Sequence, residues 1–535
     1  MATAAPRRRR KHWGWGYEDE QPSYDAVCAA AAAMAPVLGF GDSEPERPVP
    51  LEEVELPAPR IEPPAELAEV CATDAYERAA HAYGKSYRDV VRAFRGRFDH
   101  PPDAVAHPTD ERELEAVLEW CQDANAAVIP FGGGTSVVGG VEARVADRYD
   151  GAVAIDLKAM DRVLEVDPVS RAARIQAGAT GPGLEEQLAE SGHTLRHFPQ
   201  SFQFSTLGGW IATRAGGHFA TLYTHIDDLV ESVRAITPVG AWESRRLPGS
   251  GAGPSPDRLL IGSEGTLGLI TEAWLRVQAK PTYRASTSVR FPSFATGAEA
   301  VRAIAQAGLY PSNCRLIDPA EAKLTTGGDG EHALLVLGFE SADHELQAWM
   351  DRALALCREH GGEWDAPSGG GRGGAAGAWR EAFLRAPYLR DTFVAMGVLS
   401  ETFETSITWE RFPAFHEQAI GAAREAVREV CGGGSVSCRF THAYPDGPAP
   451  YFTILAPAVR GEELERWAAV KAAASDAVIA AGGTITHHHA VGRDHRPWYD
   501  RQRPDPFAAA LRGAKAAVDP RGLLNPGVLI DPVPA

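Results

Sequence analysis

The chain has 535 residues and a mass of 57.3 kDa. That is more than one hydrophobic core supports, so we expect two or more domains. With 44% hydrophobic and 23% charged residues, the composition is that of a globular protein and excludes a disordered one. Acidic residues (71) outnumber basic residues (53), and the formal net charge of −18 argues against nucleic acid as a partner.

The cysteines and the hydropathy pattern exclude further classes of protein. The seven cysteines are scattered, and none belongs to a Cys-x-x-Cys pair. This argues against a disulfide framework and against a structural zinc site. No segment reaches about 18 uncharged apolar residues, the length that a membrane-spanning helix needs. We therefore expect a cytoplasmic protein.

Residues 1–100 are expected to form an N-terminal segment that is partly helical. The segment has a basic tip at 7–11, an alanine-rich stretch that ends at Met34, and a connector at 42–64 that is rich in proline and glutamate. Nothing in it indicates a catalytic centre.

A first domain is expected over residues 101–280, because the pattern changes there to a helix followed by short strands and turn residues. The predicted helix covers 111–124, and the predicted strands cover 127–130, 153–157, 163–166 and 173–177.

A second, α+β domain is expected over residues 281–500, followed by a C-terminal segment at 501–535. Alanine-rich helical runs alternate there with strand-like runs at 287–291, 333–339 and 451–456. The glycine-rich stretch 368–377 predicts a mobile loop.

Three clusters of small residues lie in the first domain. Gly132, Gly133 and Gly134 follow a predicted strand, and consecutive glycines leave backbone N–H groups free to point into one concavity that suits a phosphate. The plainer interpretation is a tight turn. The cluster has neither the Gly-Lys-Ser/Thr ending of a P-loop nor the spacing of a Rossmann fingerprint. Similar clusters at 199–217 and 262–271 indicate a long ligand that lies against backbone, as a pyrophosphate-containing cofactor would.

The order and spacing of these clusters resemble the FAD-binding domain of the vanillyl-alcohol-oxidase or p-cresol-methylhydroxylase type, over residues 103–280. The resemblance implies an α+β protein in which an FAD-binding domain of two subdomains is joined to an α+β substrate (cap) domain and a helical N-terminal segment. Some members attach the flavin through a histidine or cysteine of the first loop, which this loop lacks, so we expect noncovalent FAD. The cofactor-binding residues implied are Pro130, Phe131, Gly132, Gly133, Gly134, Thr135, Ser136, Gln200, Ser201, Phe202, Gln203, Phe204, Ser205, Thr206, Thr213, Arg214, Ala215, Gly216, Glu264, Gly265, Thr266, Leu267, Gly268, Leu269 and Ile270.

A flavin domain alone does not identify a reaction, but motifs outside it are more specific. The segments 13–17, 400–406, 437–439, 450–452 and 487–492 together resemble the alkyldihydroxyacetonephosphate synthase family, from about residue 13 to residue 529. The resemblance implies an enzyme of ether-lipid synthesis. It exchanges the acyl group of acyl-dihydroxyacetonephosphate for a long-chain alcohol through a covalent adduct at flavin N5.

The same resemblance implies roles for particular side chains. Tyr451 is the acid/base that moves a substrate proton, and Arg439 and Arg315 hold the substrate phosphate or order the site. His487, His488 and His489 carry protons near the flavin. The segment 525–529 resembles one that returns to the active site, although its sequence departs from the family ending.

Each of these residues also has a plainer interpretation. Tyr451 beside Phe452 on a strand is typical of a core position, and Arg439 of an ion pair. If the three histidines lie on a strand, only His487 and His489 share a face. A transition-metal site is the structural alternative for them, but it needs at least one more ligand, and we expect no metal.

Two rival functions remain open from the residues alone. One is a flavin-dependent D-2-hydroxyacid dehydrogenase or oxidase acting on glycolate, D-lactate or 2-hydroxyglutarate. Such enzymes usually carry a Glu-His pair where this chain has His488-His489, and a Gly-Asp-Gly-Asn segment where it has residues 441–448, and both departures count against this function. The other rival is a non-catalytic flavin-binding protein, which would lack the acid/base residues.

A small-molecule lipid substrate raises the question of access to a membrane. The basic tip at 7–11 with Trp13 and Trp15 has the character of an interfacial anchor and equally that of a disordered tail. Peripheral contact with a membrane surface and a homodimer are candidate interactions, and no nucleic-acid partner is expected.

Overall fold

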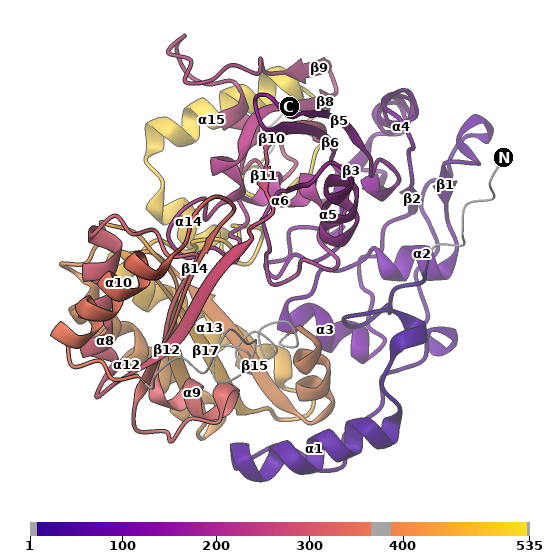
Figure 1. Ribbon diagram of the computed structural model, residues 1–535. Coiled ribbons are helices and arrows are strands. Elements are labelled where there is room, and N and C mark those ends of the chain that lie inside the picture. Colours follow the sequence, from indigo (N-terminus) through magenta and orange to yellow (C-terminus); the bar gives the residue numbers. More distant parts are fainter. Residues whose placement is uncertain (1–7, 365–386, 532–535) are drawn as a thin grey trace.

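The computed structural model describes residues 8–364 and 387–531 (Figure 1). The predicted glycine-rich loop at 368–377 lies outside the described residues. Within the described ranges, no helix is both long enough and apolar enough to cross a membrane.

The N-terminal segment runs along the outside of the molecule before the first sheet begins (Figure 1). Helix α1 (Tyr24–Leu38) begins where the Ser23 hydroxyl accepts the Ala26 N–H, and it ends at Gly39, whose φ of 79° only glycine adopts readily. It packs against Met396, Val398 and Leu455 of the second domain. Two shorter helices, α2 (Ala75–Ala80) and α3 (Tyr87–Phe94), follow it.

The first subdomain is a four-stranded sheet in the order β1-β2-β4-β3, with strands β1 (Cys71–Ala72), β2 (Ala104–Ala106), β3 (Ala126–Phe131) and β4 (Gly151–Asp156). Strand β4 pairs in parallel with both β2 and β3, so helix α4 (Glu111–Asp123) supplies a crossover between β2 and β3. Strands β3 and β4 are apolar up to Asp156 at the end of β4, because both faces of this part of the sheet are covered. The predicted helix and first strand are confirmed within one or two residues.

The second subdomain is an antiparallel five-stranded sheet in the order β5-β6-β10-β8-β9. Helix α6 (Leu207–Thr213) carries part of the second small-residue cluster and packs against the interior strands β6 and β10. The elements of this subdomain are β5 (Val163–Asp167), β6 (Ala172–Gln176), α5 (Gly181–Glu190), β7 (His193–Thr194), β8 (Val230–Thr237), β9 (Gly240–Glu243), α7 (Asp257–Leu260), β10 (Leu269–Arg276) and β11 (Gln278–Ala279).

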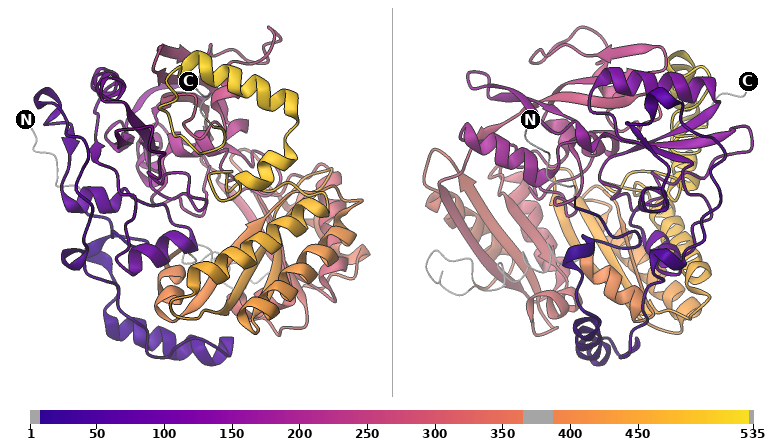
Figure 2. Two further views of the ribbon diagram at one scale, coloured as in Figure 1. Left: turned by 180° about the vertical axis from the view of Figure 1, so that it is seen from behind. Right: turned by 90° about the vertical axis from the view of Figure 1, so that its right-hand side faces the viewer.

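The second domain is an antiparallel six-stranded sheet in the order β12-β14-β13-β16-β17-β15. Helices α8 (Phe294–Gln306), α10 (Gln347–Glu359), α12 (Phe412–Cys431) and α13 (Glu463–Ala480) cover one face (Figure 2). The other face looks toward the first domain, and α9 (Pro319–Thr326) lies beside it. The strands are β12 (Tyr283–Phe291), β13 (Asn313–Ile317), β14 (Ala333–Ser341), β15 (Val398–Glu404), β16 (Ser435–Ala443) and β17 (Pro448–Pro457).

Alternation along the central strands sets the two faces of this sheet. Phe440, Phe452 and Ile454 point into the core beneath the helices, while Arg439, Tyr451 and Thr453 line the opposite side. A polar surface therefore faces the first domain.

The chain ends by returning to the first domain. Helices α14 (Arg496–Gln502) and α15 (Asp505–Val518) lead back to its sheets, where the last described residues lie (Figure 1). The Val128 N–H donates to the Leu523 carbonyl, and the Asn525 N–H donates to the Val128 carbonyl. This tail is anchored beside the strand that carries the first glycine cluster.

Candidate active site

A cavity of about 640 Å³ lies between the two domains. Its lining comes from the glycine clusters of the first domain, the polar face of the six-stranded sheet, helix α1 and the histidine loop. Segments that are far apart in the sequence therefore share one enclosed space.

The first glycine cluster forms one wall. A Cβ at Gly132 would overlap the Thr206 hydroxyl, and one at Gly133 would overlap the Phe204 carbonyl, so neither position accepts a side chain. Gly134 has a φ of 62°. The backbone of this loop therefore packs tightly against the second cluster, and it presents backbone atoms rather than side chains to the cavity.

Most of the predicted cofactor residues line this cavity, and some do not. Lining residues are Pro130, Phe131, Gly132, Gly133, Gly134, Thr135, Ser136, Gln200, Ser201, Ser205, Thr206, Thr213, Ala215, Gly216, Glu264, Gly265, Gly268, Leu269 and Ile270. Residues absent from the lining are Phe202, Gln203, Phe204, Arg214, Thr266 and Leu267. Two of these have clear structural roles instead, since Arg214 pairs with Asp227 and Leu267 is buried in the core of the second subdomain.

Glu264 joins three parts of the wall. It has a φ of 51°, and its carboxylate accepts the N–H groups of Val491 (2.9 Å) and Gly492 (2.8 Å). Its carbonyl accepts the Asn525 side-chain amide at 2.7 Å. Burial raises the pKa of Glu264 to about 7, against the two backbone N–H groups, which lower it.

Tyr451 and Arg439 meet on the polar face of the six-stranded sheet. They are paired residues of β16 and β17, and the Arg439 guanidinium stacks 3.9 Å above the Tyr451 ring. Arg439 Nη1 also pairs with Glu321 Oε1 of α9 at 2.5 Å. Burial raises the pKa of Tyr451, and the positive charge of Arg439 opposes this.

Arg315 of β13 lines the same cavity, and its Nη2 donates to the His218 carbonyl at 3.3 Å. Burial, together with the positive charge of Arg439, lowers its pKa to about 9. The two arginines therefore concentrate positive charge on one side of the cavity, opposite the glycine wall.

The three adjacent histidines lie in a loop, so the alternation that a strand would impose does not apply to them. Their backbone N–H groups all donate to the carboxylate of Glu404 at the end of β15, at 2.6 Å (His487), 3.2 Å (His488) and 3.0 Å (His489). The loop wraps around this carboxylate, so the rings spread in different directions. His488 and His489 line the cavity, whereas His487 lies behind them.

His488 and His489 surround the Tyr451 ring. Its centroid lies 6.0 Å from the His488 ring and 5.5 Å from the His489 ring. Burial lowers the pKa of His488 to about 3 and that of His489 well below its ordinary value, so both imidazoles are neutral near pH 7.

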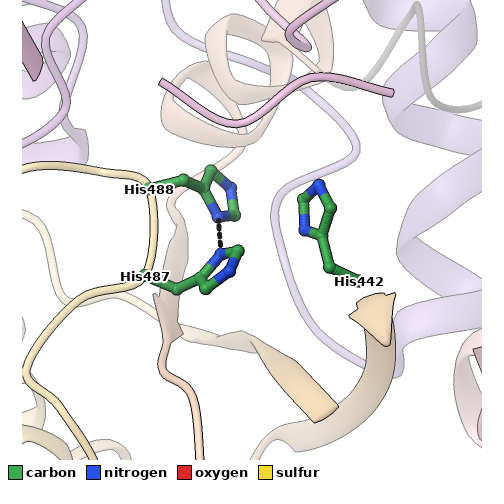
Figure 3. Close-up of side chains that lie close together, drawn as sticks. All are labelled: His442, His487 and His488. Carbon is green, nitrogen blue, oxygen red and sulfur yellow. Dashed lines mark hydrogen bonds between the residues drawn. The ribbon is translucent and has the colours of Figure 1, made fainter. Parts of the chain in front are cut away.

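Sequence reasoning missed two residues beside these histidines. One is His442, whose ring lies next to those of His487 and His488 (Figure 3), and the other is Tyr444. The His487 Nδ1 lies 3.1 Å from the His488 Nδ1, and its Nε2 lies 2.8 Å from the Tyr444 hydroxyl. His442 Nε2 lies 3.0 Å from the Gly217 carbonyl oxygen. One nitrogen from each of His442, His487 and His488 falls within 4.8 Å of the others, an arrangement that carries protons or holds a metal ion equally well. That the site acts without a metal stays a prediction.

One end of the cavity is apolar. Met34, Val37 and Leu38 of α1 line it together with Leu324, Leu389, Phe393 and Leu455. Val37, Leu324 and Leu389 are also exposed to solvent, by 67%, 43% and 37%. The cavity thus has charged and polar side chains around Arg439 and Tyr451 and an apolar mouth.

The interfacial-anchor and disordered-tail predictions for the N-terminal tryptophans are both wrong. Trp13 and Trp15 are buried, and Trp13 packs edge-on against Phe94 with a centroid distance of 5.3 Å. Lys11 Nζ pairs with Asp391 at 2.5 Å inside the protein, and the same carboxylate accepts the Trp15 N–H. These side chains are therefore unavailable to a membrane.

Comparison with known proteins agrees with this geometry. A family model described as "FAD binding domain" matches residues 102–244, and one described as "FAD linked oxidases, C-terminal domain" matches residues 280–529. The alkyldihydroxyacetonephosphate synthase of Trypanosoma brucei brucei is 30% identical over 513 residues, which is 90% of this chain and 82% of that protein. The chain belongs to the alkyldihydroxyacetonephosphate synthase family.

Other matches support this synthase-family assignment. The synthase of Dictyostelium discoideum is 30% identical over 85% of this chain and 78% of its own length. A solved alkyldihydroxyacetonephosphate synthase aligns with a TM-score of 0.80 at 26% identity, covering 97% of this chain and 98% of that one. A p-cresol methylhydroxylase structure, 16% identical with a TM-score of 0.70 over 86% and 94% of the two chains, has the same fold. The predicted fold class and family resemblance are confirmed.

FAD is the cofactor of this synthase-family protein. The cavity fits it, because Gly132, Gly133 and Gly265 are places where a Cβ would overlap neighbouring atoms and the bare backbone suits a pyrophosphate. The glycine clusters would hold FAD, and bound FAD would supply the reactive isoalloxazine ring. Its noncovalent attachment stays a prediction.

Proposed function

We propose that this protein is an FAD-dependent transferase that converts acyl-dihydroxyacetonephosphate and a long-chain alcohol into alkyl-dihydroxyacetonephosphate and a fatty acid. One observation carries the proposal: a single cavity joins a glycine cradle, two arginines with an acid/base cluster, and an apolar mouth. Family membership supplies the reaction class.

The arginines suit the phosphate of the substrate. Arg439 and Arg315 lie on neighbouring strands and face the same space, where Glu321 is the carboxylate nearest to them. Guanidinium groups match phosphate oxygens in pairs, and a buried positive charge gains from a dianion. We assign the substrate phosphate to this side of the cavity.

The resting protonation states suit proton transfer. Tyr451 is protonated near pH 7, since a phenol has an ordinary pKa of about 10 and burial raises the pKa of Tyr451 further. His488 and His489 are neutral there, so each ring presents one donor and one acceptor nitrogen. We assign to Tyr451 the exchange of a proton with the substrate carbon skeleton. We assign to His488 the onward transfer of protons, toward His487 and Tyr444, because these three side chains form a chain of polar contacts.

The reaction balances without an external oxidant. The bond between the substrate carbon and the acyloxy oxygen breaks, a bond from that carbon to the alcohol oxygen forms, and the alcohol proton leaves with the fatty acid. The net redox change is zero.

The apolar mouth at α1 suits entry of the hydrocarbon chains. Val37, Leu324 and Leu389 combine cavity lining with solvent exposure, which is typical of a surface that meets lipid. We infer that peripheral membrane contact, if the substrate is delivered from a bilayer, is made by α1 rather than by the buried tryptophans.

The test is mass spectrometry of the products formed from palmitoyl-dihydroxyacetonephosphate and hexadecanol by the FAD-loaded protein, with a sample that lacks alcohol as control. Alkyl-dihydroxyacetonephosphate with an equal amount of palmitate supports the proposal. No ether product, together with flavin reduction by glycolate, D-lactate or 2-hydroxyglutarate, would favour the dehydrogenase function instead.

A further inference from the structure

A second cavity, of about 270 Å³, lies behind the first glycine cluster. Its lining comes from residues 8–11 of the N-terminal segment, from α2 and the loop after it, from Phe131, Gly133 and Gly134, and from the end of β4. The volume is many times the roughly 30 Å³ that one water molecule takes up in the liquid. Neither Arg10 nor Lys85, which line it, belongs to the lining of the flavin cavity.

Lys85 is a buried cation without a partner. It is 5% exposed, and within the described ranges its Nζ has no hydrogen bond and no ion pair. Its backbone N–H donates to the Ser136 carbonyl at 2.6 Å, which fixes it against the flavin loop. Burial, reinforced by the positive charge of Arg10, lowers the pKa of Lys85 to about 7. The carboxylates of Asp391 and Asp89, which are paired with Lys11 and Arg92, oppose this shift without contacting Lys85.

Arg10 faces the same cavity and is also without a carboxylate partner among the described residues. Its guanidinium lies 4.3 Å above the Phe204 ring, and its Nη1 donates to the Gly133 carbonyl at 3.2 Å. Its Nε is buried with no hydrogen-bond partner in the described part of the chain. Burial lowers the pKa of Arg10 as well.

The other charges around the cavity are already matched. Ion pairs join Arg8 to Asp19, Arg9 to Glu18, Lys11 to Asp391, and Lys158 to Asp156. The lining carboxylates Glu77 and Asp156 are held by His107. Desolvation lowers the pKa of His107, but the two nearby carboxylates outweigh this and raise it to about 9, so the ring is positive near pH 7. The unmatched charge is that of Lys85 and Arg10.

We propose that this second cavity binds a small phosphate monoester, with its phosphate between Lys85 Nζ and the Arg10 guanidinium. A dianion supplies acceptors for the three N–H donors of a lysine and for the unpartnered Arg10 Nε. The remaining volume beside the Tyr76 and Phe131 rings takes a short organic group. Neither of the two phosphate-binding side chains lines the flavin cavity.

Both cations of this site also contact the loop of the first glycine cluster, residues 132–136. The Arg10 side chain donates to the Gly133 carbonyl, and the Lys85 backbone N–H donates to the Ser136 carbonyl. A bound anion relieves the mutual repulsion of the two cations and so braces this loop from behind.

The test uses the FAD-loaded protein in chloride buffer of constant ionic strength, titrated with inorganic phosphate or with glycerol 3-phosphate. Calorimetry measures binding, and thermal unfolding measures stabilisation. Lys85→Met removes the unmatched charge at similar volume, Lys85→Arg keeps a charge there, and Lys323→Met removes an exposed lysine elsewhere as control. Binding of each phosphate compound is compared between the unaltered protein and its variants. Any phosphate that binds to the arginines of the flavin cavity binds to all of these proteins alike, so it does not affect the comparison.

We expect Lys85→Met to weaken binding of the stronger probe by roughly tenfold or more, while raising the unfolding midpoint in phosphate-free buffer. Lys85→Arg and Lys323→Met should still bind. If glycerol 3-phosphate binds more tightly than inorganic phosphate, the natural ligand is a phosphate ester. If inorganic phosphate binds more tightly, the phosphate group in the site comes from free phosphate.

Two results would overturn the proposal. One is binding by Lys85→Met that equals binding by the unaltered chain. The other is loss of bound FAD from Lys85→Met at an unchanged fold, since the cavity would then serve the cofactor. If Lys85→Met does not fold, Arg10→Met gives the same comparison.

Discussion

Tyr451 can be tested by removing a single oxygen atom. Tyr451→Phe keeps the ring beneath Arg439 and beside His488, so we expect FAD binding and the unfolding midpoint to stay close to those of the unaltered chain. Turnover should fall by about 100-fold or more, the usual contribution of a general acid/base. Flavin absorbance and product formation measure the two effects separately. Retained turnover would mean that another group carries the proton.

The buried histidines predict how stability depends on pH. Burial lowers the pKa of His488 to about 3, whereas the unfolded chain has a histidine pKa of about 6.5. The unfolded state therefore binds more protons below about pH 6.5, and the free energy of unfolding falls as the pH drops from there toward the folded pKa.

Each such histidine contributes about 1.4 kcal/mol per pH unit in this window. We expect His488→Gln to show a shallower decline of the unfolding free energy between pH 6 and pH 5, measured by denaturant titration of the FAD-loaded protein. An equal slope in the variant would show that His488 is already protonated in the folded state.

At the scale of an element, the loop after β3 depends on the absence of side chains. A Cβ at Gly133 would overlap the Phe204 carbonyl, which belongs to backbone and cannot rotate away. We expect Gly133→Ala to lose most of its bound FAD during gel filtration. Gly421→Ala on α12, where a Cβ meets nothing within 4 Å, is the matched control and should keep its flavin. FAD retained by both variants would contradict the assigned cradle.

Helix α1 makes a separate prediction about lipid delivery. Val37→Asp puts a charge at the exposed apolar mouth, so we expect weaker sedimentation with phospholipid vesicles and a higher KM for vesicle-borne substrate at similar kcat. Val169→Asp is the control, because Val169 is 92% exposed on the other domain and lines neither described cavity. Equal sedimentation of both variants would place the lipid contact elsewhere.

At the scale of the whole molecule, local signals predicted the first domain well. Helix α4 and strand β3 were readable from sequence because a capped amphipathic run is followed by a short apolar run and then glycines. The glycine clusters were readable because close backbone approach demands one residue type. The family resemblance, and not the residue pattern, singled out Tyr451 and Arg439.

The parts that sequence did not predict depend on long-range packing. Trp13 and Trp15 looked like an interfacial pair, but Asp391, nearly four hundred positions away, draws their segment into the core. The histidine loop looked like a strand, but the Glu404 carboxylate collects its N–H groups. Each arrangement depends on one buried carboxylate, that of Asp391 or of Glu404. The partners of these carboxylates cannot be recognised from a local sequence pattern.

The central claim is that the alcohol replaces the acyl group of the substrate, and isotopic labelling of the alcohol oxygen tests it most directly. Hexadecanol labelled with heavy oxygen is incubated with palmitoyl-dihydroxyacetonephosphate and the FAD-loaded protein, and the products are weighed by mass spectrometry. Exchange in the cavity predicts alkyl-dihydroxyacetonephosphate that carries the label and palmitate that does not, in equal amounts. Hexadecyl palmitate that carries the label, or palmitate released without any ether product, would contradict it.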